Sequence, residues 1–293
     1  MPTARLALHA ASLILRGKRA DPTPDYDVAS TGYDDFFSKV MGGHGRGALG
    51  EVTVRPGDRV VELACGTGHL TEAIAEQLQG FGSIKAVDMS GGMLTKARKR
   101  LDAYPDLNTE LEQGDMLAFI ERQPSDSADL VVCGWAICYT KPTKLLKQIH
   151  RVLVPGGRVV IIETRADALI VLRDSLEAVL GSDPSMMTRM VHVSLPKNPG
   201  VLKRWFEQTD LKPQVLREGE QVLPWKTADE AVEWVERSGA AAGFRDAIHA
   251  SRLPELRTKL RDELHRRLSQ DSSLRLTHTF VVGVAARPSE ARR

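Results

Sequence analysis

A glycine turn separates a strand-like stretch from a helix-like stretch in residues 60–77, VVELACGTGHLTEAIAEQ. The apolar run before the turn predicts a strand over Arg59–Leu63. The helical spacing of apolar residues after it predicts a helix that Gly80 ends. Such a helix start presents bare N–H groups with no side chain in the way. The turn therefore predicts a site for a nucleotide-like ligand.

Three details of the turn narrow the class of ligand. No Gly-Lys-Ser/Thr follows it, which excludes a P-loop. Gly66 and Gly68 match the first two glycines of the dinucleotide fingerprint, but Thr71 stands in place of the third, which argues against a dinucleotide. Glu62, four residues before the first glycine, would repel a pyrophosphate, whereas it suits a ligand with a cationic amino group or a sulfonium.

Strand-like and helix-like segments alternate after this turn. The predicted strands are Ser83–Val87, Leu107–Gln113, Ala128–Cys133 and Arg158–Glu163, and the predicted helices are Gly92–Leu101, Leu117–Arg122 and Pro142–Leu153. Alternation at these lengths implies right-handed crossovers and a parallel sheet covered on both faces. The predicted fold class is therefore α/β, with a doubly wound, mostly parallel sheet.

The regular alternation of strands and helices ends at Glu163. Helices are predicted over Ala166–Leu180, Val201–Thr209 and most of Ala228–Leu268, and two strand-like runs, Gln214–Leu223 and Leu276–Ala285, bring the sheet to seven strands. The predicted segments are an N-terminal helical arm (1–47), an α/β core (48–165), a helical cap with the sixth strand (166–227), a helical insertion (228–271) and the last strand with the tail (272–293).

The composition limits the function classes. The 293 residues include 40 basic and 38 acidic side chains, so the net charge of +2 gives no electrostatic argument for nucleic-acid binding. The three cysteines form no paired motif and no histidines cluster, which indicates neither a disulfide framework nor a zinc site. A reducing cytoplasm is the simplest setting.

The apolar run Leu6–Leu15 is flanked by basic residues near the N-terminus. It is too short to span a bilayer, and no small-residue cleavage site follows it, so no stable membrane insertion is expected. Two alternatives remain for this run: a first helix packed on the domain, or an amphipathic helix at a membrane surface.

Four stretches in order carry a family resemblance: VVELACGTGHL, AVDMSGGML, GDMLAF, and ADLVVCGWAICY followed by HRVLVPGGRVVIIE. Together they cover roughly residues 57–163, and an upstream YDVASTGYDDFF is similar to the helix that precedes the sheet in the same family. The chain resembles the class I S-adenosylmethionine-dependent methyltransferases, specifically the small-molecule branch with the ubiquinone and menaquinone biosynthesis enzymes. The resemblance implies S-adenosylmethionine as cofactor and S-adenosylhomocysteine as product.

The resemblance also assigns roles to acidic residues at strand ends. Glu62 would face the amino acid end of the cofactor, and Asp88, twenty residues after Gly68, would accept from both ribose hydroxyls. Asp115 would accept from the adenine amino group while the Met116 N–H bonds the ring, although Asp115 also fits a helix N-cap.

Two methionines extend this expected site. Met89 and Met93 either sandwich the adenine or pack in the core. The full set of expected cofactor contacts is Tyr33, Glu62, Ala64, Gly66, Gly68, Asp88, Met89, Met93, Asp115, Met116 and Cys133.

The residues after the fourth strand bear on the acceptor. Cys133-Gly134-Trp135-Ala136 lacks the Asn/Asp-Pro-Pro-aromatic pattern of enzymes that methylate bases in nucleic acids. No aspartate at this rim offers a ligand for Mg²⁺, so no metal is expected. Trp135 and Tyr139 either form an aromatic wall beside the methyl group or pack in the core.

No catalytic base stands out. The candidates are Tyr33, His44, Tyr139, Glu163 and His192, and a base is optional because an acceptor can already be ionised. Met186, Met187 and Met190, with Trp225 and Trp234, are expected to give an apolar acceptor pocket in the appended segments, unless these helices only thicken the core or form a dimer face.

The sequence therefore predicts a cytoplasmic methyltransferase for a small, largely apolar acceptor, such as a quinone precursor or another secondary metabolite. Two alternatives stay open: a lipid head-group N-methyltransferase, and a protein that binds the cofactor without methyl transfer, including a cyclase. A small-molecule acceptor is the expected partner, in a monomer or homodimer.

Overall fold

The computed structural model describes residues 4–271 and 273–289; residues 1–3, 272 and 290–293 of the predicted end segments lie outside the described residues. The chain divides into two compact units. The sheet unit comprises Ser38–Ala166, Val193–Gly219 and Thr279–Arg293, and the helical unit comprises Met1–Phe37, Asp167–His192 and Glu220–His278.

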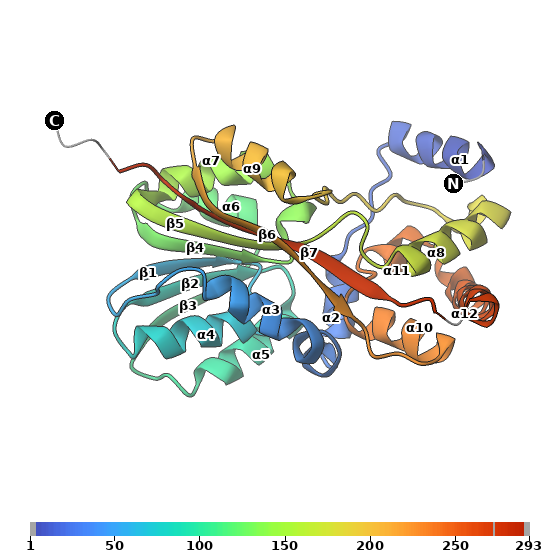
Figure 1. Ribbon diagram of the computed structural model, residues 1–293, viewed down its shortest axis with the longest axis horizontal. Coiled ribbons are helices and arrows are strands. Elements are labelled where there is room, and N and C mark those ends of the chain that lie inside the picture. Colours follow the sequence, from blue (N-terminus) through green and yellow to red (C-terminus); the bar gives the residue numbers. More distant parts are fainter. Residues whose placement is uncertain (1–3, 272, 290–293) are drawn as a thin grey trace. The chain divides into compact units, whose positions relative to one another are not determined.

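A seven-stranded sheet with the order β3-β2-β1-β4-β5-β7-β6 organises the fold (Figure 1). Its strands are β1 (Arg59–Leu63), β2 (Ser83–Asp88), β3 (Asn108–Gln113), β4 (Ala128–Gly134), β5 (Leu153–Thr164), β6 (Lys212–Val222) and β7 (Thr277–Ala286). The pairs among β1 to β5 are parallel, and β7 pairs with β5 antiparallel. The predicted α/β class with a mostly parallel seven-stranded sheet is confirmed.

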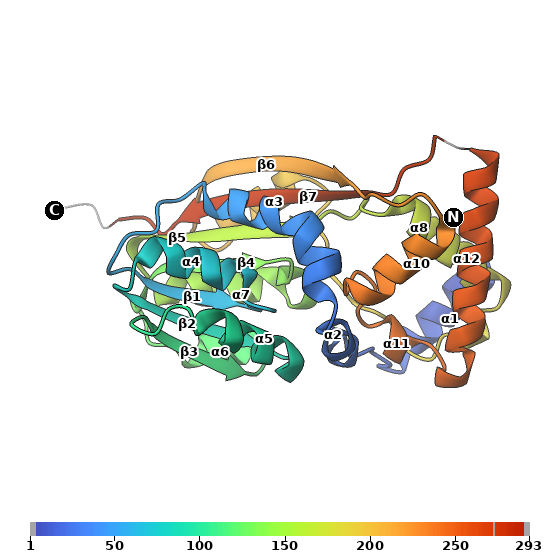
Figure 2. The same cartoon turned by 90° about the horizontal axis from the view of Figure 1, so that it is seen from below.

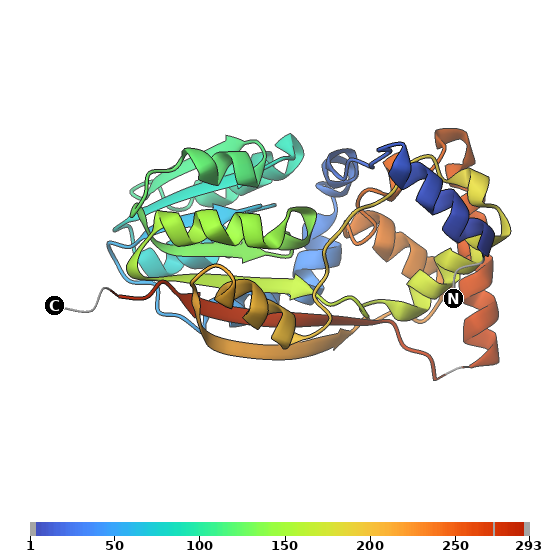
Figure 3. The ribbon, with the colours of Figure 1, turned by 90° about the horizontal axis from the view of Figure 1, so that it is seen from above.

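Helices cover both faces of the sheet within the sheet unit. They are α3 (Lys39–Leu49), α4 (His69–Leu78), α5 (Gly91–Leu101), α6 (Met116–Arg122), α7 (Pro142–Val152) and α9 (Pro199–Glu207), with the 3₁₀ turn η2 (Ile137–Tyr139). One layer consists of α3, α4 and α5, and the other of α6, α7 and α9 (Figures 2 and 3). This two-layer covering is the doubly wound arrangement expected from the alternating pattern.

Apolar strands explain why the sheet centre is buried. Every residue of β1 after Arg59 is buried, and β4 is buried or half-buried throughout, as expected for parallel strands covered on both faces. The edge strand β3 has no fully buried residue. The polar carboxyl ends of β1, β2 and β3 therefore meet at one edge of a rigid core.

The helical unit holds most of the remaining helices. They are α1 (Ala4–Leu15), α2 (Thr23–Ala29), α8 (Ile170–Ser182), α10 (Ala228–Arg237), α11 (Phe244–Ala247) and α12 (Leu253–Gln270), with the 3₁₀ turns η3 (Pro184–Met186) and η4 (Ala250–Arg252). A π-helical turn, η1 (Asp34–Ser38), lies where the chain passes from this unit into the sheet unit. The predicted helical character of the insertion from Ala228 is confirmed by α10, α11 and α12.

Two predicted boundaries are wrong by four residues or more. The fifth strand begins at Leu153 rather than Arg158, because Leu153 pairs with Ala128 and a register shift accommodates the Pro-Gly-Gly residues. The helix predicted from Ala166 begins only at Ile170, preceded by a turn in which Leu169 has a φ of 53°.

Candidate functional site

The glycine turn between β1 and α4 has the left-handed backbone that its residue types favour. Ala64, Gly66 and Gly68 have φ values of 57°, 56° and 84°. A Cβ added to Gly68 would lie 3.0 Å from the Ala97 Cα, so this glycine permits α5 to pack against the turn. A Cβ added to Gly66 would meet nothing within 4 Å, so the turn is open on that side.

The start of α4 carries no side-chain cap. Its N-cap residue is Gly68, which has no side chain to accept a hydrogen bond from the first N–H groups of the helix. A helix N-terminus without a cap leaves donors for a ligand's acceptor groups. The geometry expected from the sequence at this turn is present.

Asp88 ties the turn to the end of the neighbouring strand. Its Oδ2 accepts from the Gly66 N–H at 2.8 Å and its Oδ1 accepts from the Ser90 N–H at 2.9 Å. The Asp88 carbonyl accepts from the Gly114 N–H at 3.0 Å, which joins the loop after β3 to the same point. A carboxylate has about four acceptor positions, so each Asp88 oxygen can accept more than one hydrogen bond.

Glu62 lies buried at the end of β1, beneath the turn. It is 2% exposed, and its Oε2 accepts no hydrogen bond within the described residues. Burial raises the pKa of this carboxyl to about 8, and the neighbouring Asp88 charge acts in the same direction. A buried acid with an unused oxygen is suited to a cationic partner, which would favour its ionised form.

Arg100 was not predicted from the sequence, yet it supports the turn. Its Nε donates to the Thr67 carbonyl at 3.1 Å and its Nη1 donates to Glu72 at 3.0 Å. Arg46 on α3 donates to the same Glu72 carboxylate at 3.1 Å. The basic last turn of α5 was the available signal, but only the tertiary structure shows which of its cations reaches the turn.

The predicted adenine contacts divide between exposed and buried positions. Asp115 caps α6, with Oδ1 accepting from the Ala118 N–H at 2.8 Å, so the N-cap alternative describes this residue and a ligand would share its carboxylate. Met93 is 1% exposed and belongs to the core, whereas Met89 is 44% exposed at the end of β2. Met116 is buried at the start of α6.

The loop after β4 holds the expected aromatic residues. Trp135 has a φ of 59°, and its ring meets the Phe280 ring edge-on at 5.7 Å. Tyr139 packs against the core of the sheet unit. The core alternative thus describes Tyr139, and an aromatic wall beside the methyl group stays a prediction.

Glu163 holds the same loop from below. Its Oε2 accepts from the Cys138 N–H at 3.1 Å and its Oε1 accepts from the Thr164 N–H at 2.7 Å. Burial raises the pKa of the Glu163 carboxyl to about 7 even though these donors lower it. Since both oxygens accept backbone N–H groups, the geometry favours a supporting role over that of a base.

The buried cysteines have no reactive character. Burial raises the pKa of the Cys65, Cys133 and Cys138 thiols well above the usual range. A thiol is a nucleophile only as the thiolate, so these three side chains stay neutral. Cys133 contributes its place at the end of β4 rather than its sulfur chemistry.

Two histidines lie in the layer formed by α3 and α4. The His44 ring, a candidate base, lies 4.6 Å from the Phe280 ring. His69 opens α4 and packs against α3 so closely that a Cβ added to Gly42 would lie 2.5 Å from its Nε2. The glycine at this point of α3 therefore determines how near the helix approaches the turn.

The remaining candidates lie in the helical unit. Tyr33 packs against Phe37 with 5.0 Å between ring centroids, and His192 is exposed. Met186 is fully buried in the core of this unit, whereas Met187 and Met190 are half-buried.

Trp225 and Trp234 pack together in the same unit. Their ring centroids lie 5.4 Å apart, and the Trp234 Nε1 donates to the Phe36 carbonyl at 3.0 Å. The Trp225 Nε1 is buried and finds no acceptor within the described residues. A role of these two residues in acceptor binding stays a prediction.

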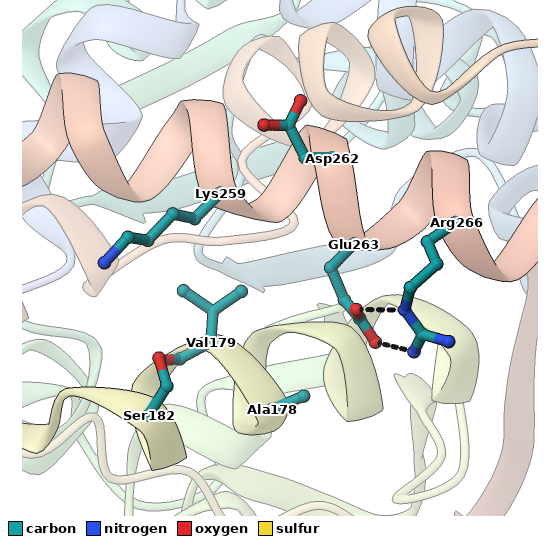
Figure 4. A pocket seen from close by; sticks show the side chains of 7 residues that line it. All are labelled: Ala178, Val179, Ser182, Lys259, Asp262, Glu263 and Arg266. Carbon is teal, nitrogen blue, oxygen red and sulfur yellow. Dashed lines mark hydrogen bonds and ion pairs between the residues drawn. The ribbon is translucent and has the colours of Figure 1, made fainter.

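Two surface pockets have volumes of about 380 and 320 Å³. The first lies between α8 and α12, where Glu263 accepts hydrogen bonds from Arg266 (Figure 4). The second is lined by residues at the amino ends of β1 and β4, away from the glycine turn. Neither contains a predicted site residue, because one is lined by charged helix surfaces and the other lies at the opposite edge of the sheet.

Among residues 4–271 and 273–289, no group of three or more His, Cys, Asp or Glu side chains is placed to hold a metal ion. In the same ranges, no helix has the length and apolar character needed to cross a bilayer.

Comparisons with known proteins match methyltransferases. Residues 60–157 match the family model described as a methyltransferase domain. A demethylmenaquinone methyltransferase of Symbiobacterium thermophilum is 35% identical over 146 residues, which are 47% of this chain and 57% of that protein. The ubiquinone/menaquinone biosynthesis C-methyltransferase UbiE of Cupriavidus metallidurans is 29% identical, over 64% of this chain and 82% of that protein.

Solved structures agree on the fold. A putative methyltransferase from Bacillus halodurans has a TM-score of 0.56 at 17% identity, covering 83% of this chain and 98% of that one. Phospholethanolamine N-methyltransferase 2 of Haemonchus contortus has a TM-score of 0.55 at 19% identity, covering 90% and 58%. At these identities the likeness shows the fold alone. The chain spans about half the length of the first curated relatives that it matches.

Proposed function

We propose that this chain, a class I S-adenosylmethionine-dependent methyltransferase by its matched domain and its fold, transfers a methyl group to a small, largely apolar acceptor. The observation that carries the proposal is the unused Oε2 of buried Glu62 beneath an open glycine turn, beside Asp88. A phosphate would be repelled by the Asp88 carboxylate, and it would not favour the ionised form of Glu62. A ligand with a cationic amino group and a ribose fits them both.

The residues of the sheet unit fit the cofactor in three parts. Glu62 would hold the amino group, and Asp88, whose carboxylate accepts from the Gly66 and Ser90 N–H groups, would also accept from the ribose hydroxyls. Asp115, the Met116 N–H and the exposed Met89 side chain lie after β3 and β2, where the adenine would bind. When bound, the cofactor supplies an electrophilic methyl carbon on a sulfonium.

The protein's task in the transfer is alignment. An in-line displacement needs the acceptor atom held opposite the departing sulfur and water kept out. Trp135 and Tyr139 on the loop after β4 are proposed to form the acceptor side, with Glu163 holding that loop in place. His44 and Tyr139 of the sheet unit stay candidate bases, and Tyr33 and His192 of the helical unit stay candidates too, because an acceptor that is not already ionised needs a proton removed.

A quinone-like acceptor is the more specific proposal. It is supported by the names of the curated relatives, which are demethylmenaquinone and ubiquinone/menaquinone methyltransferases. Met187, Met190 and Trp225 of the helical unit are proposed to contribute an adaptable apolar lining. A cytoplasmic monomer or homodimer without nucleic-acid contacts completes the proposal.

One observation favours a second candidate, a lipid head-group N-methyltransferase. The first helix exposes large apolar side chains next to basic residues, a combination suited to lipid contact. The two candidates differ in the group that receives the methyl: a head-group nitrogen in this candidate and an apolar ring in the first.

The test offers the purified chain methyl-labelled cofactor with a demethylated prenyl naphthoquinone, reduced to its hydroquinone and kept under argon, in one reaction and phosphoethanolamine in another. Labelled quinone is the expected product. Label transferred only to phosphoethanolamine would replace the first candidate by the second. Cofactor bound without transfer in either reaction, or with a mixed metabolite extract, would indicate a binding protein on the same fold.

A further inference from the structure

We propose that α1 seats the protein on the surface of an anionic lipid bilayer, with Leu8, Ala11 and Leu15 facing the lipid. This inference goes beyond methyl transfer, because it concerns only the outer surface of the helical unit. The face formed by these three residues is called the outer face of α1 below.

The inner face of α1 is already in use. Leu6 and Leu13 are each 7% exposed, and Leu6 packs in the apolar core of the helical unit. His9 Nε2 lies 2.8 Å from the Met187 carbonyl, which fixes the same side of the helix. Figure 1 shows α1 beside α8, which it contacts, as it also contacts η3.

The outer face is as apolar as the inner one. Leu8 is 73% exposed and Leu15 is 87% exposed, and their spacing of seven residues, with Ala11 between them, places them on one side of the helix. Ile14 flanks them at 63% exposed. Three of the nine large hydrophobic side chains that are exposed among the described residues thus lie on this one helix of 12 residues.

A surface helix normally turns its polar side to water. A helix that is apolar on both faces is found where both faces have an apolar contact. The inner face packs within the helical unit. The outer face therefore needs an apolar partner of its own. Scattered exposed leucines would need no such explanation, but a continuous apolar face does.

Basic residues at both ends of α1 identify the partner. Arg5 lies in its first turn, and Arg16, Lys18 and Arg19 follow its last residue, whereas the first acidic residue of the chain is Asp21. All four cations are exposed, and within the described residues their side chains form no ion pair. An apolar face with unpaired cations at both ends complements an anionic lipid surface.

The same charges disfavour a second copy of the chain as the partner. Two α1 helices packed face to face, parallel or antiparallel, would bring basic ends together without an acid to compensate them. The helix also has 12 residues, and about 20 are needed to cross a bilayer. The geometry is therefore that of a helix lying in the plane of the lipid surface.

The experiment is cosedimentation of the full chain with vesicles, without cofactor or acceptor. Vesicles of phosphatidylcholine with phosphatidylglycerol are compared with phosphatidylcholine alone, at low and high salt. The wild type should bind the anionic vesicles, and Leu8→Ser with Leu15→Ser should lower the partition constant at least about tenfold, since two side chains lose their apolar contact. A second variant, Arg16→Gln with Lys18→Gln and Arg19→Gln, should lose most of the salt-sensitive binding.

A matched control comes from the sheet unit. Phe81 is 73% exposed, like Leu8, but lies in the loop after α4, so Phe81→Ser should sediment with the vesicles as the wild type does. Circular dichroism and the affinity for S-adenosylmethionine report that each variant is folded, because none of the changed side chains belongs to the cofactor site.

Three outcomes would overturn the proposal. The wild type would not sediment with anionic vesicles, or the serine variant would bind as well as the wild type. In the third, the wild type would be a dimer in solution that Leu8→Ser with Leu15→Ser dissociates, with no vesicle binding by either protein, so that a second copy covers the outer face. None of these outcomes bears on methyl transfer, which is measured separately.

Discussion

The Gly66 N–H donates to Asp88 Oδ2 at 2.8 Å, so one carboxylate at the end of β2 holds the turn that follows β1. The same carboxylate caps the backbone at Ser90 through its other oxygen. A single side chain therefore shapes the turn and carries the acceptors proposed for the ribose. Substituting it should affect every ligand that has that ribose.

The first prediction follows from this double role. Asp88→Ala should weaken the binding of S-adenosylmethionine and of S-adenosylhomocysteine by similar factors, about 10 to 150-fold. This range corresponds to about 1.5–3 kcal/mol, the contribution of hydrogen bonds to a charged group. Titration calorimetry with both ligands measures the two factors. If only one of the ligands weakened, Asp88 would be contacting the reacting end instead.

Ser90→Ala is the matched control for that change. Ser90 caps α5 by accepting from the Met93 N–H at 3.1 Å, without a proposed ligand contact. Its loss should cost about 1 kcal/mol of unfolding free energy and leave both affinities near the wild-type values. Equal weakening in both variants would indicate that helix capping, rather than the ribose, explains the effect.

The second prediction concerns the charge at Glu62. Because the pKa of this carboxyl is about 8 in the free protein, a cationic amino group that binds it should displace a proton at neutral pH. Titrations of S-adenosylhomocysteine in two buffers of different ionisation enthalpy count the protons released. Glu62→Gln should weaken binding and release fewer protons than the wild type. An unchanged dissociation constant would remove Glu62 from the site.

The third prediction is a pH dependence of stability from Glu163. Its pKa rises from 4.5 in the unfolded chain to about 7 in the folded protein, so the folded state holds a proton that the unfolded state has lost between those values. The contribution to the unfolding free energy is therefore present at acidic pH and is lost as the pH rises, by roughly 3 kcal/mol. Denaturant unfolding from pH 5 to pH 8 measures the loss.

Glu163→Gln separates the effect of Glu163 on stability from that of Glu62, whose raised pKa changes the stability in the same direction with pH. The variant should lose stability more gently with pH than the wild type, because the amide that replaces the carboxyl cannot titrate. It should also raise the KM for the acceptor by a larger factor than the dissociation constant of the cofactor, since Glu163 holds the loop that carries Trp135 and Tyr139. Identical slopes in the two proteins would show that Glu163 does not titrate in this range.

The fourth prediction compares neighbouring glycines of α3. A Cβ at Gly42 would lie 2.5 Å from His69 Nε2, whereas a Cβ at Gly43 would meet nothing within 4 Å. Gly43→Ala should raise the unfolding free energy by about 1 kcal/mol through helix propensity. Gly42→Ala should displace His69 and weaken cofactor binding. Two variants with equal stability and affinity would show that α3 does not position the start of α4.

The sheet and the glycine turn were predictable because they follow from local patterns. Strand-like apolar runs alternate with helix-like segments as far as Glu163. Only a few sheet topologies are compatible with this alternation. The start of β5 was not predictable in this way. Leu153 joins the strand because it pairs with Ala128 across a register shift, and pairing between distant residues leaves no local signature.

The site was predictable at its acidic strand ends and less so elsewhere. Glu62 and Asp88 lie where the turn pattern puts them, but the burial of Met93 and the exposure of Met89 depend on how α5 packs. Arg100 reaches Thr67 from 33 residues away, one cation among several at the end of its helix. Contacts of this kind are decided by tertiary packing rather than by residue type.

Transfer of a labelled methyl group under single-turnover conditions tests the central claim most directly. The purified chain, loaded with methyl-labelled S-adenosylmethionine, is mixed with a demethylated prenyl naphthoquinone that has been reduced to its hydroquinone, beside the Asp88→Ala and Ser90→Ala variants. We expect label in the extracted quinone from the wild type and from Ser90→Ala, and little from Asp88→Ala. No labelled product from a wild-type chain that binds the cofactor, with the quinone or with any acceptor in a metabolite extract, would contradict a methyltransferase function.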